Sequence, residues 1–143
     1  MLERTIGFGD LSVKRIMTPL SEIDSVDLSL DEEKFLDMAV ETSRSRIPVF
    51  MKSKDNIIGY IHIKDILWAW QENKGHFVRS LVKPPYFVGE DKKINDLLKE
   101  FQSGKTHIAL VKDKSDNISG MVTLEDILEE VVGEILDEYE FEQ

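Results

Sequence analysis

The sequence predicts an α+β fold made of two copies of one βαββα unit, packed as a pseudo-two-fold pair. The main observation is an internal repeat with a constant offset along the chain, which relates Gly59 to Gly120 and Asp65 to Asp126. Between residues 44–67 and 105–128, eight of 24 aligned positions are identical, and several others exchange one apolar residue for another. The second observation is that strand-like and helix-like hydrophobic patterns alternate in the same order in each copy. A unit of this size buries little core of its own, so the two copies are expected to pack together.

The first copy has the pattern of a strand, an amphipathic helix, a strand hairpin and a second helix. The helix start is marked by Ser29 and Glu32, whose three-residue spacing is typical of a capping box. The hairpin is indicated by two runs of β-branched and apolar residues on either side of a polar turn. The expected elements are a strand at 26–28, a helix from Ser29 through Val40, strands at 47–50 and 57–61 around the turn 52–56, and a helix from Asp65.

The second copy repeats this order. Its first helix has apolar residues at i, i+3, i+4 and i+7, counted from Ile94, which is the period of one buried helix face. Its last helix carries an apolar stripe that includes Ile127, Val131 and Ile135. The expected elements are a strand at 86–88, a helix around 94–101, strands at 108–111 and 118–122 around the turn 113–117, and a helix from Asp126.

The repeat also divides the chain into segments. We expect a linker at 1–12, the first repeat at 13–70, a connector at 71–80, the second repeat at 81–136 and an acidic tail at 137–143. From Glu125 to Gln143 there are nine acidic residues and no lysine or arginine, whereas acidic and basic residues nearly balance in the rest of the chain. This acidic stretch is either a solvated helix face or a site for a divalent cation or a partner. Neither end resembles a natural boundary, so a piece of a longer protein is expected.

Composition excludes several classes of protein. The 143 residues have a net charge of −10 and no cysteine, which excludes disulfides and thiolate zinc sites. The charge distribution shows no basic patch that could bind nucleic acid. No apolar run approaches the roughly 20 residues of a membrane helix. The sequence contains no P-loop, GxGxxG or GxSxG motif, and its three histidines lack metal-ligand spacing. We therefore expect neither an enzyme nor a metal site, and no insertion into a membrane by this segment.

The candidate binding residues lie where the last strand of each copy meets its second helix. In the second copy Thr123 ends the strand and Asp126 follows in the first turn of the helix, so both side chains lie on one side of that turn. A carboxylate in this position can accept two hydroxyl hydrogen bonds from a vicinal diol such as ribose. The same residues at the same spacing also form an ordinary helix cap. Both interpretations stay open.

The entry to the first strand of each hairpin offers a second wall for a pocket. Arg44 and Arg46 carry forked donors that suit phosphates, and the alternative is that they are solvated surface charges. Polar residues of this wall are Arg44, Ser45 and Arg46 in the first copy and Lys105, Thr106 and His107 in the second, and apolar walls are Ile47, Pro48 and Met121. A diol-binding carboxylate, cationic groups and apolar walls together favour an adenine nucleotide.

Four segments in chain order carry a resemblance to a known family. They are residues 16–20 (IMTPL), 46–50 (RIPVF), 104–109 (GKTHIA) and 122–130 (VTLEDILEE). Each copy resembles the CBS domain, and the tandem resembles the CBS pair, or Bateman module, of the CorC/cyclin M group of magnesium and cobalt transport proteins, also called hemolysin-like. The resemblance covers roughly Val13 to Ile135.

The resemblance implies binding of ATP or AMP, in some relatives with Mg²⁺. Carried over by position, Thr123 and Asp126 would hold the ribose, while Thr18 and Ser45–Pro48 would frame the base and the phosphates from the other repeat. The first repeat departs from the family pattern, because His62 stands where a hydroxyl is usual. A second, weaker pocket is expected at His62, Asp65, Thr106 and His107.

For the whole module the resemblance implies a regulatory role without catalysis. The nucleotide would bridge both repeats, stabilise one relative orientation and relay its occupancy to an attached transport apparatus. A homodimer is expected, with the apolar helix near Trp68 as a candidate contact. The segment is expected to be cytoplasmic, as the cytosolic part of a membrane protein. The alternative is a scaffold for dimerisation and interaction, in the same parent protein, that binds no ligand.

Overall fold

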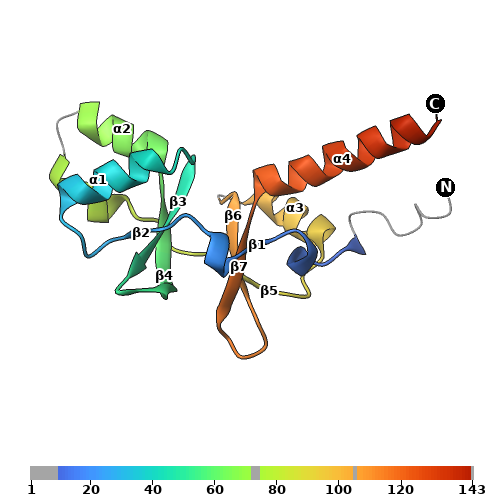
Figure 1. Ribbon diagram of the computed structural model, residues 1–143, viewed down its shortest axis with the longest axis horizontal. Coiled ribbons are helices and arrows are strands. Elements are labelled where there is room, and N and C mark those ends of the chain that lie inside the picture. The colour runs from blue at the N-terminus through green and yellow to red at the C-terminus, as the bar shows by residue number, and fades with distance from the viewer. Residues whose placement is uncertain (1–9, 72–74, 105, 143) are drawn as a thin grey trace. The chain divides into compact units, whose positions relative to one another are not determined.

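The computed structural model describes residues 10–71, 75–104 and 106–142. Outside these described residues lie most of the expected linker, part of the expected connector, the strand-entry residue Lys105 and the last residue of the tail. The chain forms two compact units: unit 1 contains the described residues up to Ser21 and from Tyr86 onward, and unit 2 contains Glu22–Pro85. Figure 1 labels the α-helices and the strands of both units.

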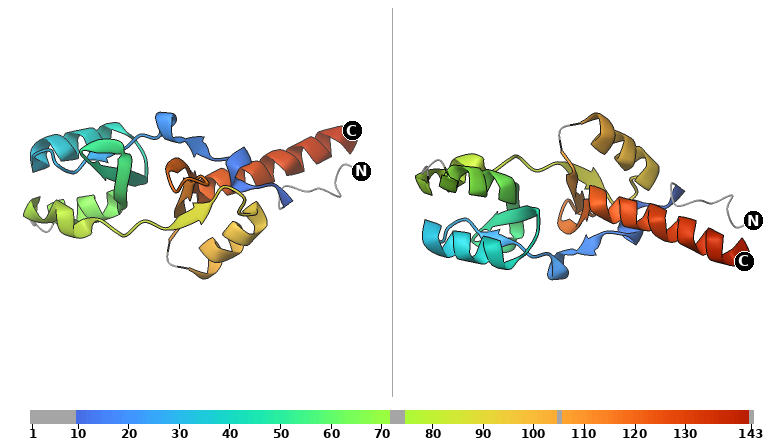
Figure 2. Two further views of the ribbon diagram at one scale, coloured as in Figure 1. Left: turned by 90° about the horizontal axis from the view of Figure 1, so that it is seen from below. Right: turned by 90° about the horizontal axis from the view of Figure 1, so that it is seen from above.

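Unit 2 is a three-stranded sheet with two α-helices on one face, as Figure 2 shows. Its elements are β2 (Val26–Asp27), α1 (Glu32–Glu41), β3 (Arg46–Met51), β4 (Ser53–His62), α2 (Ile63–Gln71) and the 3₁₀ helix η5 (Gly75–Leu81). Strand β3 lies in the middle, parallel to β2 and antiparallel to β4. Phe35 of α1, Ile47 of β3 and Ile66 of α2 are buried in one apolar cluster between the helices and the sheet. Burial of each large side chain contributes about 1.5–3 kcal/mol.

Unit 1 has a four-stranded sheet in the order β1-β7-β6-β5. Its elements are η3 (Val13–Arg15), β1 (Thr18–Pro19), β5 (Phe87–Gly89), α3 (Ile94–Ser103), β6 (Ile108–Lys112), β7 (Ile118–Thr123) and α4 (Leu124–Glu142), and the short helix η4 (Leu20–Glu22) follows β1. The core joins Phe101 of α3, Val122 of β7 and Ile127 of α4 with Val13, which comes from the other end of the chain. The buried side chains of α3 and α4 thus belong to one core with the sheet of unit 1.

Both units have the topology that the repeat predicts, so the α+β class with two βαββα copies is confirmed. In each, a short strand runs parallel to the first strand of a hairpin, and the hairpin is antiparallel. The segments that lead from one unit into the next also pair with equivalent strands. Thr18 is the partner of Met121 on β7, and Lys83 forms a bridge with Tyr60 on β4.

Two local predictions in the first copy are wrong. Helix α1 begins at Glu32 with Asp31 as its cap, because an Asp31 carboxylate oxygen accepts from the N–H of Lys34 at 2.9 Å. Ser29 is not the cap, since its hydroxyl donates to Asp27 at 2.7 Å. The predicted turn at 52–56 is also wrong, because β4 already begins at Ser53 and the reversal occurs at Lys52, whose φ is +71°.

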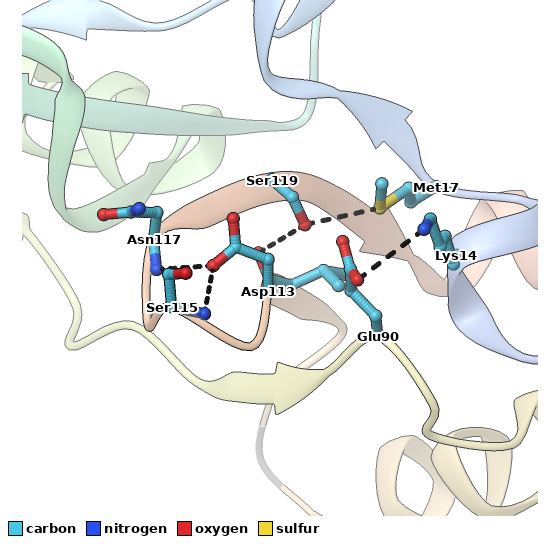
Figure 3. A network of polar contacts seen from close by, with 8 residues as sticks. Lys14, Met17, Glu90, Asp113, Ser115, Asn117 and Ser119 are labelled. Carbon is cyan, nitrogen blue, oxygen red and sulfur yellow. Dashed lines mark hydrogen bonds and ion pairs between the residues drawn. The ribbon is translucent and has the colours of Figure 1, made fainter.

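The corresponding turn of the second copy is confirmed at 113–117, between β6 and β7. One carboxylate oxygen of Asp113 accepts from the N–H groups of Ser115 at 2.8 Å and Asn117 at 3.0 Å (Figure 3). Asp116 takes the left-handed conformation with φ +68°, which Asp tolerates better than most residues. The Asp113 side chain therefore organises this loop.

Helix α4 continues without a break through residues 137–142, where the sequence predicts the acidic tail. The boundaries drawn for linker, repeats, connector and tail stay a prediction. Within the described residues, no helix is both long enough and apolar enough to cross a membrane.

Candidate functional site

Thr123 and Asp126 form a reciprocal pair where β7 meets α4. The N–H of Thr123 donates to Oδ2 of Asp126 at 2.9 Å, and the N–H of Asp126 donates to Oγ1 of Thr123 at 3.2 Å. This is the geometry of a capping box, with Asp in the place of the usual Glu. The helix cap that the sequence allows is therefore present.

In the capped geometry, both side chains keep a group that can form a further hydrogen bond. Within the part of the chain that the structure describes, Oδ1 of Asp126 accepts no hydrogen bond. Thr123 uses its Oγ1 only as an acceptor, so its hydroxyl hydrogen can still be donated. Both residues are partly exposed. Because a carboxylate oxygen beside a hydroxyl donor can hold a diol while the cap remains intact, the two interpretations are compatible.

The other candidates of unit 1 lie near this pair. Thr18 is the strand partner of Met121, which precedes Thr123 by two positions on β7. The carbonyl of His107 accepts from the N–H of Leu124 at 2.9 Å, which fixes the strand entry against the start of α4. Unit 1 therefore brings together Thr18, Thr106, His107, Met121, Thr123 and Asp126 at one end of β7.

In unit 2, the strand entry lies against the equivalent junction of β4 and α2. Arg46 is the strand partner of His62, and the carbonyl of Ser45 accepts from the N–H of Ile63 at 2.9 Å. In unit 1 the repeat equivalent of Ile63 is Leu124, and its N–H donates to the carbonyl of His107. The repeat equivalent of Ser45 is Thr106, so the two bonds differ by one position along the strand entry. Arg46 is therefore a direct neighbour of His62, a residue of the predicted second pocket.

Arg44 forms an exposed ion pair, whereas Ile47 and Pro48 of the predicted apolar wall are buried. Nε of Arg44 forms an ion pair with Oδ2 of Asp24 at 3.3 Å, and both side chains are more than half exposed. This is the solvated arrangement that the alternative interpretation predicts, and such pairs contribute about 0–1 kcal/mol. Ile47 and Pro48 are buried in β3.

His62 does not reproduce the role of Thr123. Its Nδ1 accepts from the N–H of Lys64 at 3.1 Å, one position earlier than in a capping box. Burial, and next the positive charge of Arg46, hold the pKa of the His62 imidazole below its ordinary value, while Asp65 opposes them. Asp65 has a different partner from Asp126, because its Oδ2 lies 3.5 Å from Nζ of Lys83.

Sequence reasoning missed Lys83. The constant offset of the repeat aligns Thr18 with Arg79, but the strand pairing aligns it with Lys83, because Tyr60 and Met121 are equivalent. The signal that could have found it is Gly59. A Cβ at Gly59 would collide with the carbonyl oxygen of Lys83, as one at Gly120 would with that of Thr18.

Thr123 and Asp126 belong to unit 1 and Ser45–Pro48 belong to unit 2, and their combination in one pocket stays a prediction. Across residues 10–71, 75–104 and 106–142, no group of three or more histidine or carboxylate side chains is placed to hold a metal ion.

Comparison with known proteins gives consistent matches over the whole chain. The CBS domain model matches residues 13–72 and again residues 78–133. The magnesium and cobalt efflux protein CorC of Pasteurella multocida (strain Pm70) is 37% identical over 144 residues, covering 100% of this chain and 48% of that protein. The chain thus spans about half the length of the curated relatives that it matches.

Solved structures of CBS domains also match most of the chain. The CBS domain of a bacterial CNNM/CorC family Mg²⁺ transporter in complex with ATP has a TM-score of 0.80 and 37% identity, covering 92% of this chain and 94% of that chain. A CBS-domain pair with bound AMP from Klebsiella pneumoniae has a TM-score of 0.76 and 30% identity, covering 85% and 98%. The expectation of a module without catalysis agrees with the family that these matches show. The chain belongs to the CBS-domain family, as a CBS pair of the CorC/CNNM magnesium transport group.

Proposed function

We propose that this CBS pair binds an adenine nucleotide, ATP or AMP, at the junction of β7 and α4 and acts as the regulatory sensor of its parent protein. The observation that carries the proposal is the Thr123–Asp126 pair, which keeps a carboxylate oxygen and a hydroxyl hydrogen available beside the cap. Asp126 would accept from the ribose hydroxyls, and Thr18 and Met121 would lie beside the base.

The similarity to CBS structures that contain ATP and AMP supports this ligand class. Ser45–Pro48 of the first repeat would complete the pocket, with Arg46 toward the phosphates. Mg²⁺ would enter with the nucleotide, bound mainly by its phosphates, because Mg²⁺ is commonly held through substrate phosphates rather than by an all-protein cage.

Regulation would follow from differential affinity. A nucleotide that bound one arrangement of the two repeats more tightly than others would raise the population of that arrangement. The parent protein would then be a magnesium or cobalt transport or efflux protein, with this segment on its cytosolic side. This part of the proposal rests on the curated relatives, which are named for magnesium and cobalt efflux.

Exposed apolar side chains on the second helix of each unit support a homodimer. Leu67 of α2 and Leu128 of α4 are equivalent in the repeat and are 56% and 47% exposed, and Val132 is 53% exposed. A stable dimer buries roughly 800 Å² on each partner. Light scattering at tens of micromolar should give twice the chain mass, and Leu67→Glu with Leu128→Glu should give the monomer mass.

A scaffold without a physiological ligand is the second candidate. The observation that favours it is the cap itself, which accounts for Thr123 and Asp126 without any ligand. A scaffold would dimerise as above and show no saturable stabilisation by nucleotides.

Calorimetric titration with ATP, ADP and AMP, with and without Mg²⁺, separates the two candidates. We expect a dissociation constant in the micromolar range, about −8 kcal/mol. Asp126→Asn keeps an acceptor for the Thr123 N–H but removes the charge, so affinity should fall at least about tenfold. Asp96→Asn is the matched control, because Asp96 occupies the first turn of α3 in the same unit. Absence of heat with every nucleotide, on a folded chain, would favour the scaffold.

A further inference from the structure

Residues 10–19, called the strap here, carry Thr18 to the candidate site. They belong to unit 1, although they precede the chain of unit 2 in sequence. The last two residues of the strap are β1, where Thr18 is the partner of Met121. The first residues of the strap contact the segment between β5 and α3 of the same unit. The strap therefore connects a docking contact at one end with the candidate nucleotide site at the other.

The docking contact consists of backbone hydrogen bonds and apolar burial. The N–H of Val13 donates to the carbonyl of Lys92 at 2.8 Å. The N–H of Ile94, the first residue of α3, donates to the carbonyl of Leu11 at 2.9 Å. The Val13 side chain is fully buried in the core of unit 1, and Leu11 packs against the same core. These contacts hold the first part of the strap on residues 92–94.

The other end of the strap is a very short strand. β1 has two residues, and one of them, Pro19, has no N–H to donate to β7. Beside it, Sδ of Met17 accepts from the hydroxyl of Ser119 at 3.9 Å (Figure 3), and a thioether is a weak acceptor. Ordering a chain segment costs backbone entropy for every residue. A strand of two residues therefore stays in place only while the chain beside it is fixed.

A single helical turn links the docking contact to β1. The N–H groups of Ile16 and Met17 both donate to the carbonyl of Val13, at 3.1 and 2.9 Å, around the short helix η3. Thr18 follows Met17 directly, so little slack separates it from the buried Val13 side chain. Release of the docked end would free β1, and a ligand that fixes Thr18 would stabilise the docked end.

We propose that the strap is a coupling device, in which docking on residues 92–94 and nucleotide occupancy at the β7–α4 junction stabilise each other. The device acts on the nucleotide site proposed at Thr123 and Asp126, so it rests on the proposed function. A ligand that binds only the docked form favours docking by the same factor by which docking favours the ligand. Because the strap continues into η4, where the chain passes from unit 1 to unit 2, occupancy would fix the chain at this crossing.

Hydrogen exchange of the full chain, followed by NMR, measures docking directly. The reporters are the amides of Val13 and Ile94, because their hydrogen bonds join the strap to residues 92–94. The probe is ATP or AMP, whichever binds more tightly in calorimetry. At ten times its dissociation constant, exchange through undocking should slow about tenfold. The amide of Asp113, which donates to the carbonyl of Asn117 in the β6–β7 loop, is the internal control and should not change.

Leu11→Ala tests the reverse direction of the coupling. Leu11 lies on the strap, so the variant should lower the docked fraction and weaken nucleotide affinity about two- to tenfold. Leu98→Ala is the matched control, because Leu98 of α3 is also partly buried against the core of unit 1 but does not belong to the strap. Calorimetry should give this control the affinity of the wild type.

A reversible lock on the strap separates loss of docking from any other effect of Leu11→Ala. Ser12 and Lys93 form an antiparallel bridge whose flanking residues are hydrogen-bonded, a pair with Cα atoms about 4.5 Å apart. This separation suits a disulfide, and the chain has no cysteine of its own. Adding Ser12→Cys and Lys93→Cys to Leu11→Ala should restore the wild-type affinity when oxidised and lose it again on reduction.

The outcomes distinguish this device from the nucleotide site itself. If the folded wild type shows no heat with any nucleotide, both proposals fail. If the wild type binds but the Val13 and Ile94 amides exchange as before, and Leu11→Ala binds as Leu98→Ala does, only the coupling fails. If the oxidised lock does not restore the affinity of Leu11→Ala, the loss does not come from undocking, and the coupling is also overturned.

Discussion

At the residue scale, a neighbouring backbone segment passes close to each of two equivalent glycines, Gly59 and Gly120. A Cβ on Gly120 would lie 2.6 Å from Sδ of Met17 and 2.7 Å from the carbonyl oxygen of Thr18. The carbonyl belongs to the backbone of β1, which is paired with β7 and cannot yield as a flexible side chain does. The absence of a side chain at Gly120 is therefore what allows β1 to carry Thr18 to the candidate site.

We expect Gly120→Ala to lower the free energy of unfolding by about 1–3 kcal/mol, because β1 must move away from β7. Gly133→Ala is the control, since no atom lies within 4 Å of a Cβ at this position in α4. That change should raise stability by about 0.5–1 kcal/mol through helix propensity. Urea denaturation of both variants measures the difference, and equal effects would contradict the packing argument.

His62 gives a pH dependence of stability with a defined sign. Burial and then Arg46 lower the pKa of His62 in the folded chain, whereas the unfolded value is about 6.5. As the pH falls below about 6.5, the unfolded chain therefore binds the proton first, and stability decreases until the folded-state pKa is passed. The contribution is fully present above that window. Unfolding free energies of the wild type and His62→Gln should diverge between pH 7.5 and pH 5, with the wild type losing more. Parallel pH profiles would contradict the assignment.

The sequence could predict part of the site at this scale. Spacing alone identifies Thr123 and Asp126, because a strand end followed three positions later by a carboxylate is a local pattern. Lys83 could not be found in this way. Its place beside Asp65 depends on pairing with Tyr60, and the offset of the repeat points to Arg79 instead of Lys83.

At the element scale, the start of α4 serves both the fold and the candidate site. Thr123→Val removes the Oγ1 that accepts from the N–H of Asp126, so the free energy of unfolding should fall by about 0.5–2 kcal/mol. Thr123→Ser keeps the acceptor and should cost less. Urea denaturation compares the two variants, and an equal loss would show that the cap does not stabilise α4.

Element types were predictable from hydrophobic periodicity, but some of their ends were not. Ser29 and Glu32 have capping-box spacing, yet Asp31 is the cap because Ser29 is already bonded to Asp27. The same competition did not affect Thr123, because its hydroxyl oxygen accepts from the N–H of Asp126 and α4 begins at the next residue, Leu124. The reversal at Lys52 escaped prediction because its positive φ shortens the turn and extends β4.

At the scale of the whole molecule, unit 1 takes chain from both sides of unit 2 in sequence. Val13 is fully buried in the core of unit 1, and its N–H donates to the carbonyl of Lys92 at 2.8 Å. Val26, the first residue of β2, is almost equally buried in the core of unit 2. The internal repeat does not predict that the segment before β2 belongs to unit 1. The constant offset of the repeat aligns no counterpart with that segment.

This division of the chain between the two units predicts that Val13 and Val26, although close together in sequence, stabilise different units. Val13→Ala should lower hydrogen-exchange protection in β6 and β7, and Val26→Ala should lower it in β3 and β4. Each change leaves a cavity that costs about 1–3 kcal/mol in the unit that contains it. Because the substitutions are identical and the two sites similarly buried, each variant is the control for the other. If both variants lower protection equally in all four strands, the units unfold as one body and the assignment of their stability to separate cores is wrong.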